Sequence, residues 1–170
     1  MTSEKGIGTL AGIAARLPDD VRASCRLLLL GGTAAGPCDV GGIEAFRAGF
    51  VDEVHPAMAG LDLLWHPSSA EGLGTAVIDA MALGVPPVAF AVGGLRELIV
   101  DGESGLLAPA GDESAFALLV ERLVRDPARR ARLGDGGRIR AREFGVERMV
   151  EGTAAVYRTV LAAAAHRRDR

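Results

Sequence analysis

The residues best suited to chemistry lie between Pro67 and Pro86, where a loop of small residues with one acid precedes a predicted helix. The loop holds Glu71 and the turn Gly72-Leu73-Gly74-Thr75, and it follows an apolar run that ends at Pro67. Glycines let backbone N–H groups approach a phosphate, and a helix N-terminus carries partial positive charge that stabilises an anion by about 0.3–1 kcal/mol. A strand, a glycine turn and a helix in this order predict an anion site at the end of the strand.

Two acids flank this turn at a spacing that lets them face one ligand. Seven residues separate Glu71 from Asp79, and Thr75 lies one helical turn before Asp79, so these two share a helix face. The residues expected to face inward from the same helix are Ala76, Val77, Ala80 and Met81. Two carboxylates beside an anion site suit a ligand with phosphates at one end and hydroxyls at the other, such as a nucleotide sugar.

These motifs make the chain resemble the C-terminal, donor-binding domain of a family 4 glycosyltransferase of GT-B architecture. That family is marked by Pro-Ser-x-x-Glu-Gly-Phe-Gly, a second Glu after seven further residues, Ala-Met-Ala-x-Gly-x-Pro and a Gly-Gly pair. This chain has Pro-Ser-Ser-Ala-Glu-Gly-Leu-Gly at 67–74, Asp-Ala-Met-Ala-Leu-Gly-Val-Pro at 79–86 and Gly93-Gly94. The similarity continues through 101–109 and 126–127, so it covers nearly the whole chain.

The resemblance implies a role for each matching residue. Glu71 would hydrogen-bond the donor sugar, and Asp79 would hold the ribose hydroxyls. Gly72, Leu73, Gly74 and Thr75 would donate backbone N–H groups to phosphate or sugar. For Glu71 a simple turn acid, for Asp79 a solvated helix acid and for the glycines an ordinary tight turn remain the alternatives.

Two further positions match the family less fully. Lys5 corresponds to a lysine that neutralises the leaving diphosphate, although a lysine near a terminus is usually solvent-exposed. Phe50, which follows Gly49, corresponds to a loop whose backbone edges the nucleobase, and a core aromatic residue is the alternative. His66 could line the site, but a hydrogen-bonded structural histidine is the simpler interpretation.

The sequence also departs from the family pattern. Asp79 is one methylene shorter than the usual Glu, and Leu73 replaces an aromatic residue. The family's Arg, which clamps the diphosphate together with the Lys, and the strand before it have no counterpart ahead of Lys5. We therefore expect a truncated GT-B half, residues 1–170 forming one nucleotide-sugar-binding domain, without its first strand and without the N-terminal acceptor domain.

The function implied by the resemblance is transfer of a sugar from a nucleoside diphosphate sugar to an acceptor hydroxyl, with retention of configuration. The acceptor would be a carbohydrate, a lipid-linked molecule or a small molecule. No cofactor or metal ion is expected, because protein cations would stabilise the diphosphate. We expect the isolated chain to be weak or inactive, needing an N-terminal GT-B domain in trans. The alternatives are a non-catalytic nucleotide-binding subunit or remnant and, less well matched, a nucleotide-sugar epimerase.

Composition also indicates the size of the domain and argues against several other classes of function. The 170 residues predict one domain with an aliphatic core, since only 4% are aromatic. A net charge of −3 gives no basic balance for nucleic acid. Cys25 and Cys38 have no metal-site spacing, and no signal peptide or membrane span is recognisable, so we expect the cytoplasm. The basic end at 166–170 indicates a solvated helix terminus or, alternatively, peripheral contact at the inner face of the membrane.

Strands that alternate with helices predict an α/β fold with a doubly wound, Rossmann-like parallel sheet. Segment 33–44 has no clear period and indicates a loop with, at most, a short helix. The expected strands are 26–30, 45–49, 61–66, 85–91 and 105–108. The expected helices are 7–17, about eight residues ending near 60, 74–84, a short one after 94, 112–125, 126–134 and 146–164.

A missing first strand would have a physical cost, because that strand usually sits near the centre of such a sheet. Its absence leaves backbone groups unpaired and aliphatic surface exposed. We therefore expect the isolated chain to be marginally stable, or to fill the gap by rearrangement or association.

Overall fold

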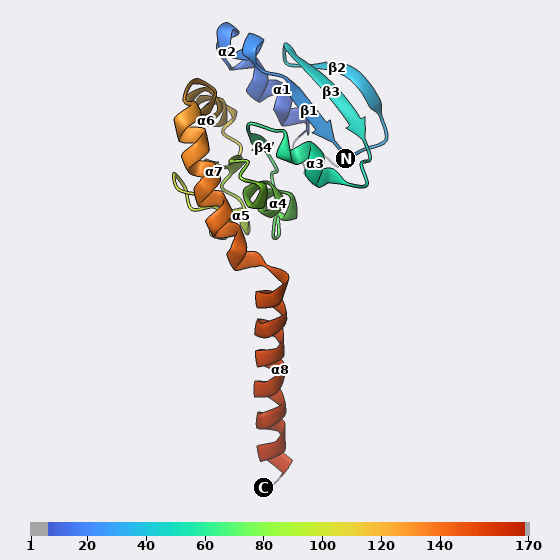
Figure 1. Ribbon diagram of the computed structural model, residues 1–170, viewed down its shortest axis with the longest axis vertical. Coiled ribbons are helices and arrows are strands. Elements are labelled where there is room, and N and C mark those ends of the chain that lie inside the picture. The colour runs from blue at the N-terminus through green and yellow to red at the C-terminus, as the bar shows by residue number, and fades with distance from the viewer. Residues whose placement is uncertain (1–6, 169–170) are drawn as a thin grey trace.

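The protein is described by a computed structural model over residues 7–168 (Figure 1). The helices are α1 (Ile7–Ala15), α2 (Asp19–Ser24), α3 (Val54–Ala59), α4 (Thr75–Leu83), α5 (Leu95–Leu98), α6 (Glu113–Arg125), α7 (Pro127–Ala141) and α8 (Val146–Arg168), with a 3₁₀ turn at Arg142–Phe144. The strands are β1 (Leu27–Leu30), β2 (Ala35–Val40), β3 (Ile43–Gly49), β4 (Leu64–His66), β5 (Pro87–Phe90) and β6 (Leu106–Ala108).

The strands form two sheets of three, in the orders β1-β3-β2 and β4-β5-β6. β1 runs parallel to β3, and β4, β5 and β6 are all parallel, so the predicted α/β fold with parallel strands is confirmed. Within the described residues β1 and β4 do not pair, so these strands belong to two sheets. The β1-β3-β2 sheet stands apart from β4 in Figure 1.

Segment 33–44 was wrongly expected to be a loop, because it contains β2 and the turn of a hairpin. β2 pairs antiparallel with β3, and Val40 lies opposite Ile43 across the two-residue turn Gly41-Gly42. Both glycines have positive φ, 59° and 85°, as a tight hairpin turn requires. The Gly-Gly pair between two short runs was therefore the signal for a hairpin.

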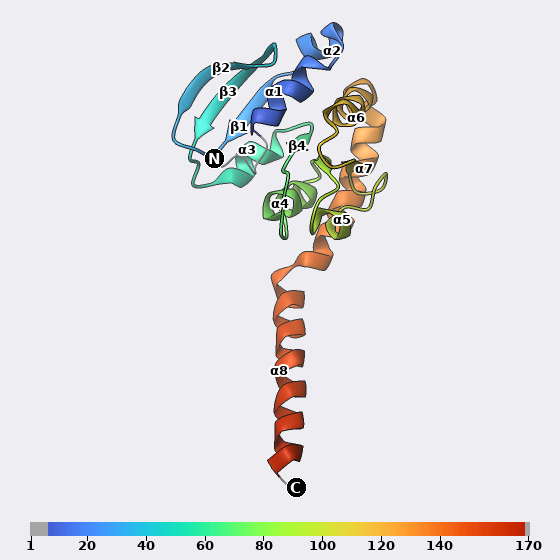
Figure 2. The ribbon, with the colours of Figure 1, turned by 180° about the vertical axis from the view of Figure 1, so that it is seen from behind.

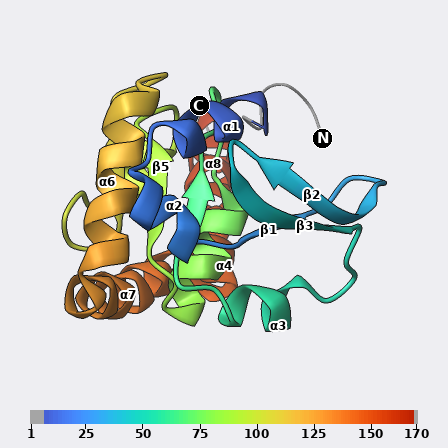
Figure 3. The same ribbon diagram turned by 90° about the horizontal axis from the view of Figure 1, so that it is seen from above.

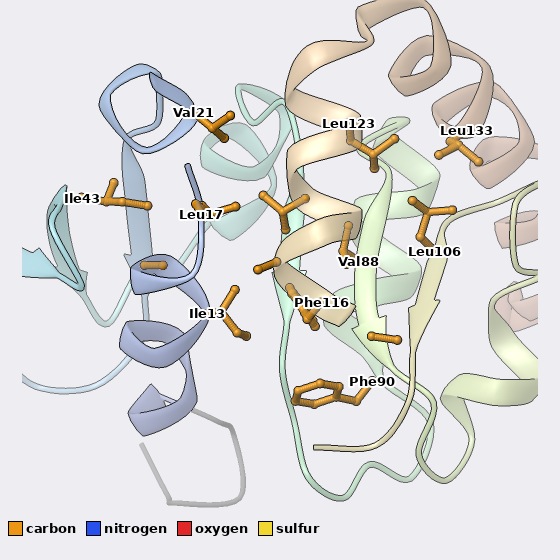
Figure 4. Close-up of a cluster of buried hydrophobic side chains, with 14 residues drawn as sticks. Ile13, Leu17, Val21, Ile43, Val88, Phe90, Leu106, Phe116, Leu123 and Leu133 are labelled. Carbon is orange, nitrogen blue, oxygen red and sulfur yellow. The ribbon is translucent and has the colours of Figure 1, made fainter. Parts of the chain in front are cut away.

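Helices cover both faces of the β4-β5-β6 sheet, and Figure 3 shows β5 between α6 and α4. On one face α1 and α6 share a core with both sheets, in which Phe116 meets Phe90 edge-on with ring centres 5.2 Å apart (Figure 4). On the other face Val77 and Met81 of α4 pack with Ala89 of β5. The wound arrangement of helices and parallel strands positions the carboxyl ends of β4 and β5 at one edge.

The later helices follow local signals, with one exception. The side chains of Asp112 and Asp126 cap α6 and α7 by accepting bonds from the amides of Ala115 and Arg129 at 2.9 and 2.8 Å. Gly134 was wrongly expected to end α7, which continues to Ala141. Glycine is needed there for packing, since a Cβ on Gly134 would lie 2.2 Å from the carbonyl oxygen of Gly84.

α8 leads away from the rest of the protein in both Figure 1 and Figure 2 and leaves apolar side chains exposed. The last helix was predicted from residue 146, and it extends to Arg168. The helices in the described ranges are each too short or too polar to cross a bilayer.

Candidate functional site

The loops that follow β4 and β5 meet at the carboxyl edge of their sheet. In open α/β sheets this edge is where ligands bind, outside the ends of parallel strands. The first loop, residues 67–74, carries Glu71 and the glycine turn, and the second, residues 91–94, carries the Gly93-Gly94 pair. The segment singled out from the sequence therefore lies where the fold places its ligand sites.

The two loops touch through their backbones, and this contact requires glycine. The amide of Gly94 donates to the carbonyl oxygen of Glu71 at 3.2 Å. A Cβ on Gly93 would lie 2.0 Å from the Glu71 carbonyl oxygen, and one on Gly94 would lie 1.9 Å from that of Gly72. The amide of Gly94 therefore holds the first loop in place.

The turn leads into α4 with its amides available. Gly74 precedes the helix with φ 74°, and a Cβ there would strike Leu95 at 2.7 Å, so the residue must be glycine. The first backbone bond of α4 comes from the amide of Val77 to the Gly74 carbonyl. Over the part of the chain that the structure describes, the amides of residues 72–76 donate to no protein acceptor. These are the orphan donors of a helix N-terminus, and they suit an anion.

α4 presents its apolar side to the core much as the sequence predicted. Val77, Ala80 and Met81 are fully buried, whereas Ala76 is exposed instead of facing inward. The exposed face carries Thr75 and, one turn later, Asp79. The helix is therefore fixed by packing on one side and free to meet a ligand on the other.

Glu71 is paired with a histidine that the sequence did not identify as its neighbour. Its carboxylate Oε2 lies 3.1 Å from Nε2 of His66, the last residue of β4, and the two side chains are only 12% and 13% exposed. An ionised carboxylate can only accept a hydrogen bond, so Nε2 of His66 carries the proton in this pair. The contact orients the Glu71 side chain beside the amides of the turn.

Asp79 has a different histidine neighbour. Its Oδ1 lies 3.7 Å from Nε2 of His55, which α3 brings against α4, and the Asp79 side chain is 40% exposed. No spacing in the sequence links His55 to Asp79, because the contact depends on how α3 and α4 pack. The two acids thus occupy distinct environments, one sheltered and one open to solvent.

Two further positions, Phe50 and Lys5, were singled out from the sequence. Phe50 is 80% exposed just after Gly49 at the end of β3, which excludes the core alternative. Lys5 lies outside the described residues. The His, Cys, Asp and Glu side chains in the described ranges form no group of three placed to bind a metal ion.

Comparison with known sequences identifies the family. Residues 1–126 match the profile of the glycosyl transferases group 1. A D-inositol 3-phosphate glycosyltransferase of Xylanimonas cellulosilytica is 35% identical over 166 residues, which cover 90% of this chain and 39% of that protein. A putative glycosyltransferase EpsD of Bacillus subtilis is 38% identical over 109 residues, which cover 64% of this chain and 29% of that protein.

Solved structures agree with the sequence comparison. Sucrose-phosphate synthase from Thermosynechococcus elongatus is 31% identical with a TM-score of 0.81, over 95% of this chain and 44% of that one. Anabaena Alr3699/HepE in complex with UDP is 25% identical with a TM-score of 0.78, over 93% of this chain and 46% of that one. The chain thus spans less than half the length of each of these four proteins. It belongs to the group 1 glycosyl transferases, and its fold is that of a GT-B glycosyltransferase domain.

Proposed function

We propose that this chain is the nucleotide-sugar-binding part of a retaining glycosyltransferase. The observation that carries the proposal is the start of α4, where the amides of residues 72–76 have no protein acceptor within the described chain and lie beside Glu71. Orphan amides at a helix N-terminus bind phosphate, and a sheltered carboxylate next to them binds sugar hydroxyls. The UDP named in the HepE structure supports a nucleoside diphosphate as the anion.

Each residue has a defined part in this proposal. Gly72, Leu73, Gly74 and Thr75 donate backbone N–H groups to the diphosphate, while Glu71 accepts bonds from the sugar hydroxyls. Asp79 holds the ribose, one helical turn beyond Thr75. Phe50 edges the nucleobase through its backbone, and Lys5 faces the diphosphate.

The chemistry follows from where charge develops. As the bond from the sugar's anomeric carbon to the diphosphate breaks, negative charge grows on the leaving oxygens, and preorganised amides stabilise it. The acceptor hydroxyl then bonds through its oxygen to the same face of the sugar and gives its proton to the departing diphosphate oxygen, so configuration is retained. Because fixed amides and Lys5 supply the positive potential, we propose that donor binding needs no metal ion.

The acceptor side lies beyond this chain in the proposal. The chain matches less than half of each relative's length, so we propose that a second domain, in trans where necessary, supplies the acceptor hydroxyl. The 170 residues alone should bind donor and transfer little or nothing. A carbohydrate, a lipid-linked molecule or a small molecule would serve as acceptor.

Titration calorimetry on the 170-residue chain tests the proposal. Uridine, guanosine and adenosine diphosphate sugars are titrated separately, and one of them should bind measurably in the presence of a chelator. Glu71→Gln should weaken binding of that nucleotide sugar about tenfold while leaving the free nucleoside diphosphate nearly unchanged, since the carboxylate serves the sugar. Glu103→Gln, an exposed acid in the loop before β6, is the matched control. Failure of all three donors to bind at millimolar concentration would refute the proposal.

A further inference from the structure

The polar face of α4 continues beyond Asp79 onto the neighbouring helix α3. Nε2 of His55 lies 3.7 Å from Oδ1 of Asp79, and the two side chains are 63% and 40% exposed. Thr75 stands one helical turn before Asp79 on the same face of α4. Three polar side chains from two helices therefore border one surface that a ligand can reach.

The position of His55 is fixed by its apolar neighbours. Met58 of α3 is buried together with Ala80 of α4, and Val54 packs against the same cluster. Figure 3 shows α3 beside α4. Because His55 lies between Val54 and Met58 in the sequence, this packing holds its backbone next to Asp79 without any polar contact.

The contact between His55 and Asp79 leaves the hydrogen-bonding capacity of both side chains free. An N–H···O hydrogen bond spans about 2.7–3.2 Å, so the 3.7 Å separation is that of an ion pair only. Within the described residues neither side chain has a hydrogen bond to another protein group. Exposed pairs of this kind contribute little to stability, so the two groups are available to a ligand.

The chemistry of the pair is matched to a hydroxyl group. A carboxylate only accepts hydrogen bonds, an imidazole N–H donates one, and a hydroxyl does both. A hydroxyl oxygen beside the two atoms can therefore donate to Oδ1 of Asp79 and accept from Nε2 of His55. An anion is disfavoured at the same place, because the carboxylate repels negative charge.

The order of the groups along α4 indicates which hydroxyl this is. The step rests on the function proposed above, in which the amides of residues 72–76 hold the diphosphate and Asp79 holds the ribose. In a nucleotide the ribose joins phosphate to base, so the base lies beyond Asp79 as seen from the turn. α3 packs on that side, at Ala80, and the segment that leads into it carries Phe50. The 2′-hydroxyl is on the carbon next to the one that bears the base, so it is the hydroxyl nearest to α3.

We propose that His55 donates a hydrogen bond to the ribose 2′-hydroxyl, which in turn donates to Asp79, so that the site selects ribonucleotides over 2′-deoxyribonucleotides. His55 is then a specificity-determining residue that touches the ligand directly. Its contribution comes from α3, whereas the residues that hold the diphosphate and the sugar come from the loop before α4.

Titration calorimetry on the full chain tests this inference. Uridine, guanosine and adenosine diphosphates are titrated, each with its 2′-deoxy and 3′-deoxy forms. The diphosphate that binds the parent should bind about tenfold tighter than its 2′-deoxy form. His55→Ala should weaken the ribose and 3′-deoxy forms about fivefold and leave the 2′-deoxy form unchanged, because only the first two carry the 2′-hydroxyl. His55→Gln keeps an N–H donor and should recover part of the preference.

A second exposed ion pair provides the matched control. Arg26→Ala removes the partner of Glu44, 2.9 Å away near the start of β3, and should change none of the affinities. The inference is overturned, and the proposed function is not, if the parent binds ribose and 2′-deoxy forms equally. The same conclusion follows if His55→Ala leaves the ratio of these two affinities as it is in the parent, since His55 would then act only through the fold. Binding of none of the three diphosphates to the parent would refute the proposed function, and the inference with it.

Discussion

The amide of Gly94 donates a hydrogen bond of 3.2 Å to the carbonyl oxygen of Glu71, so the loop after β5 holds the loop after β4. The approach is so close that neither Gly93 nor Gly94 has room for a Cβ. Glu71 is thus fixed from two directions, through its carbonyl by Gly94 and through its carboxylate by His66. The position of the candidate sugar-binding acid depends on both contacts.

Gly94→Ala should disrupt the loop that carries Glu71. The added methyl would lie 1.9 Å from the Gly72 carbonyl oxygen, so the backbone must shift, at a cost of about 1–3 kcal/mol in the free energy of unfolding. Donor binding should weaken at least about tenfold, because the amides of the turn move with the loop. Urea unfolding and calorimetry measure the two effects. Gly152→Ala is the control, since nothing lies within 4 Å of a Cβ there.

Removal of the imidazole next to Glu71 should also destabilise the protein. His66→Leu takes a hydrogen-bond donor from a carboxylate that is 12% exposed, which should lower the free energy of unfolding by about 1–3 kcal/mol at neutral pH. His66→Gln retains an N–H donor and should recover part of the stability. Equal unfolding free energies for all three proteins would show that the contact contributes nothing.

Features set by neighbouring residues could be predicted from the sequence, and features set by distant packing could not. Asp112 and Asp126 cap helices through amides three residues away, so their role is visible locally. Thr75 and Asp79 share a face of α4 for the same reason. Gly134 was misinterpreted as a helix stop because the reason for glycine there lies far away in the sequence. The carbonyl oxygen of Gly84 leaves no room for a side chain at this position. Propensity marks glycine as a breaker, and the tertiary contact overrides it.

In the candidate site, too, some features could be predicted from the sequence and others could not. The turn at 72–75 follows from the sequence, whereas the His55 neighbour of Asp79 depends on the packing of α3 against α4. The hairpin at Gly41-Gly42 was missed although its signal is local, because β2 contains glycine and proline that do not indicate a strand. Pairing with β3 compensates for this low strand propensity.

Gly134→Ala should lower stability even though alanine favours helix formation. A Cβ at Gly134 would come within 2.2 Å of the Gly84 carbonyl oxygen, so α7 must move away from the end of α4. We expect a loss of about 1–3 kcal/mol in the free energy of unfolding, measured by urea titration. Gly152→Ala in α8 makes the same change without a neighbour and should be neutral or stabilising by up to about 1 kcal/mol. Similar results for the two variants would contradict the packing explanation.

The ion pair between α2 and α6 should make a small part of the stability dependent on pH. Arg125 Nη1 lies 2.8 Å from Asp20 Oδ2, and this guanidinium lowers the pKa of Asp20 below its ordinary value of 3.8. A lowered carboxyl pKa means that the stabilisation is present above the ordinary value and is lost as pH falls through the lowered one.

Asp20→Asn should therefore reduce the melting temperature slightly at pH 7 and have no effect near pH 2. The side chains of Asp20 and Arg125 are about half exposed or more. At pH 7, 0.5 M salt should therefore remove most of the difference in melting temperature between Asp20→Asn and the parent. Asp52→Asn changes an exposed acid without an ion pair in the described structure and should leave the melting temperature unchanged at both pH values. A difference between Asp20→Asn and the parent that persisted at pH 2 or in high salt would show that the side chain acts through packing and not through its charge.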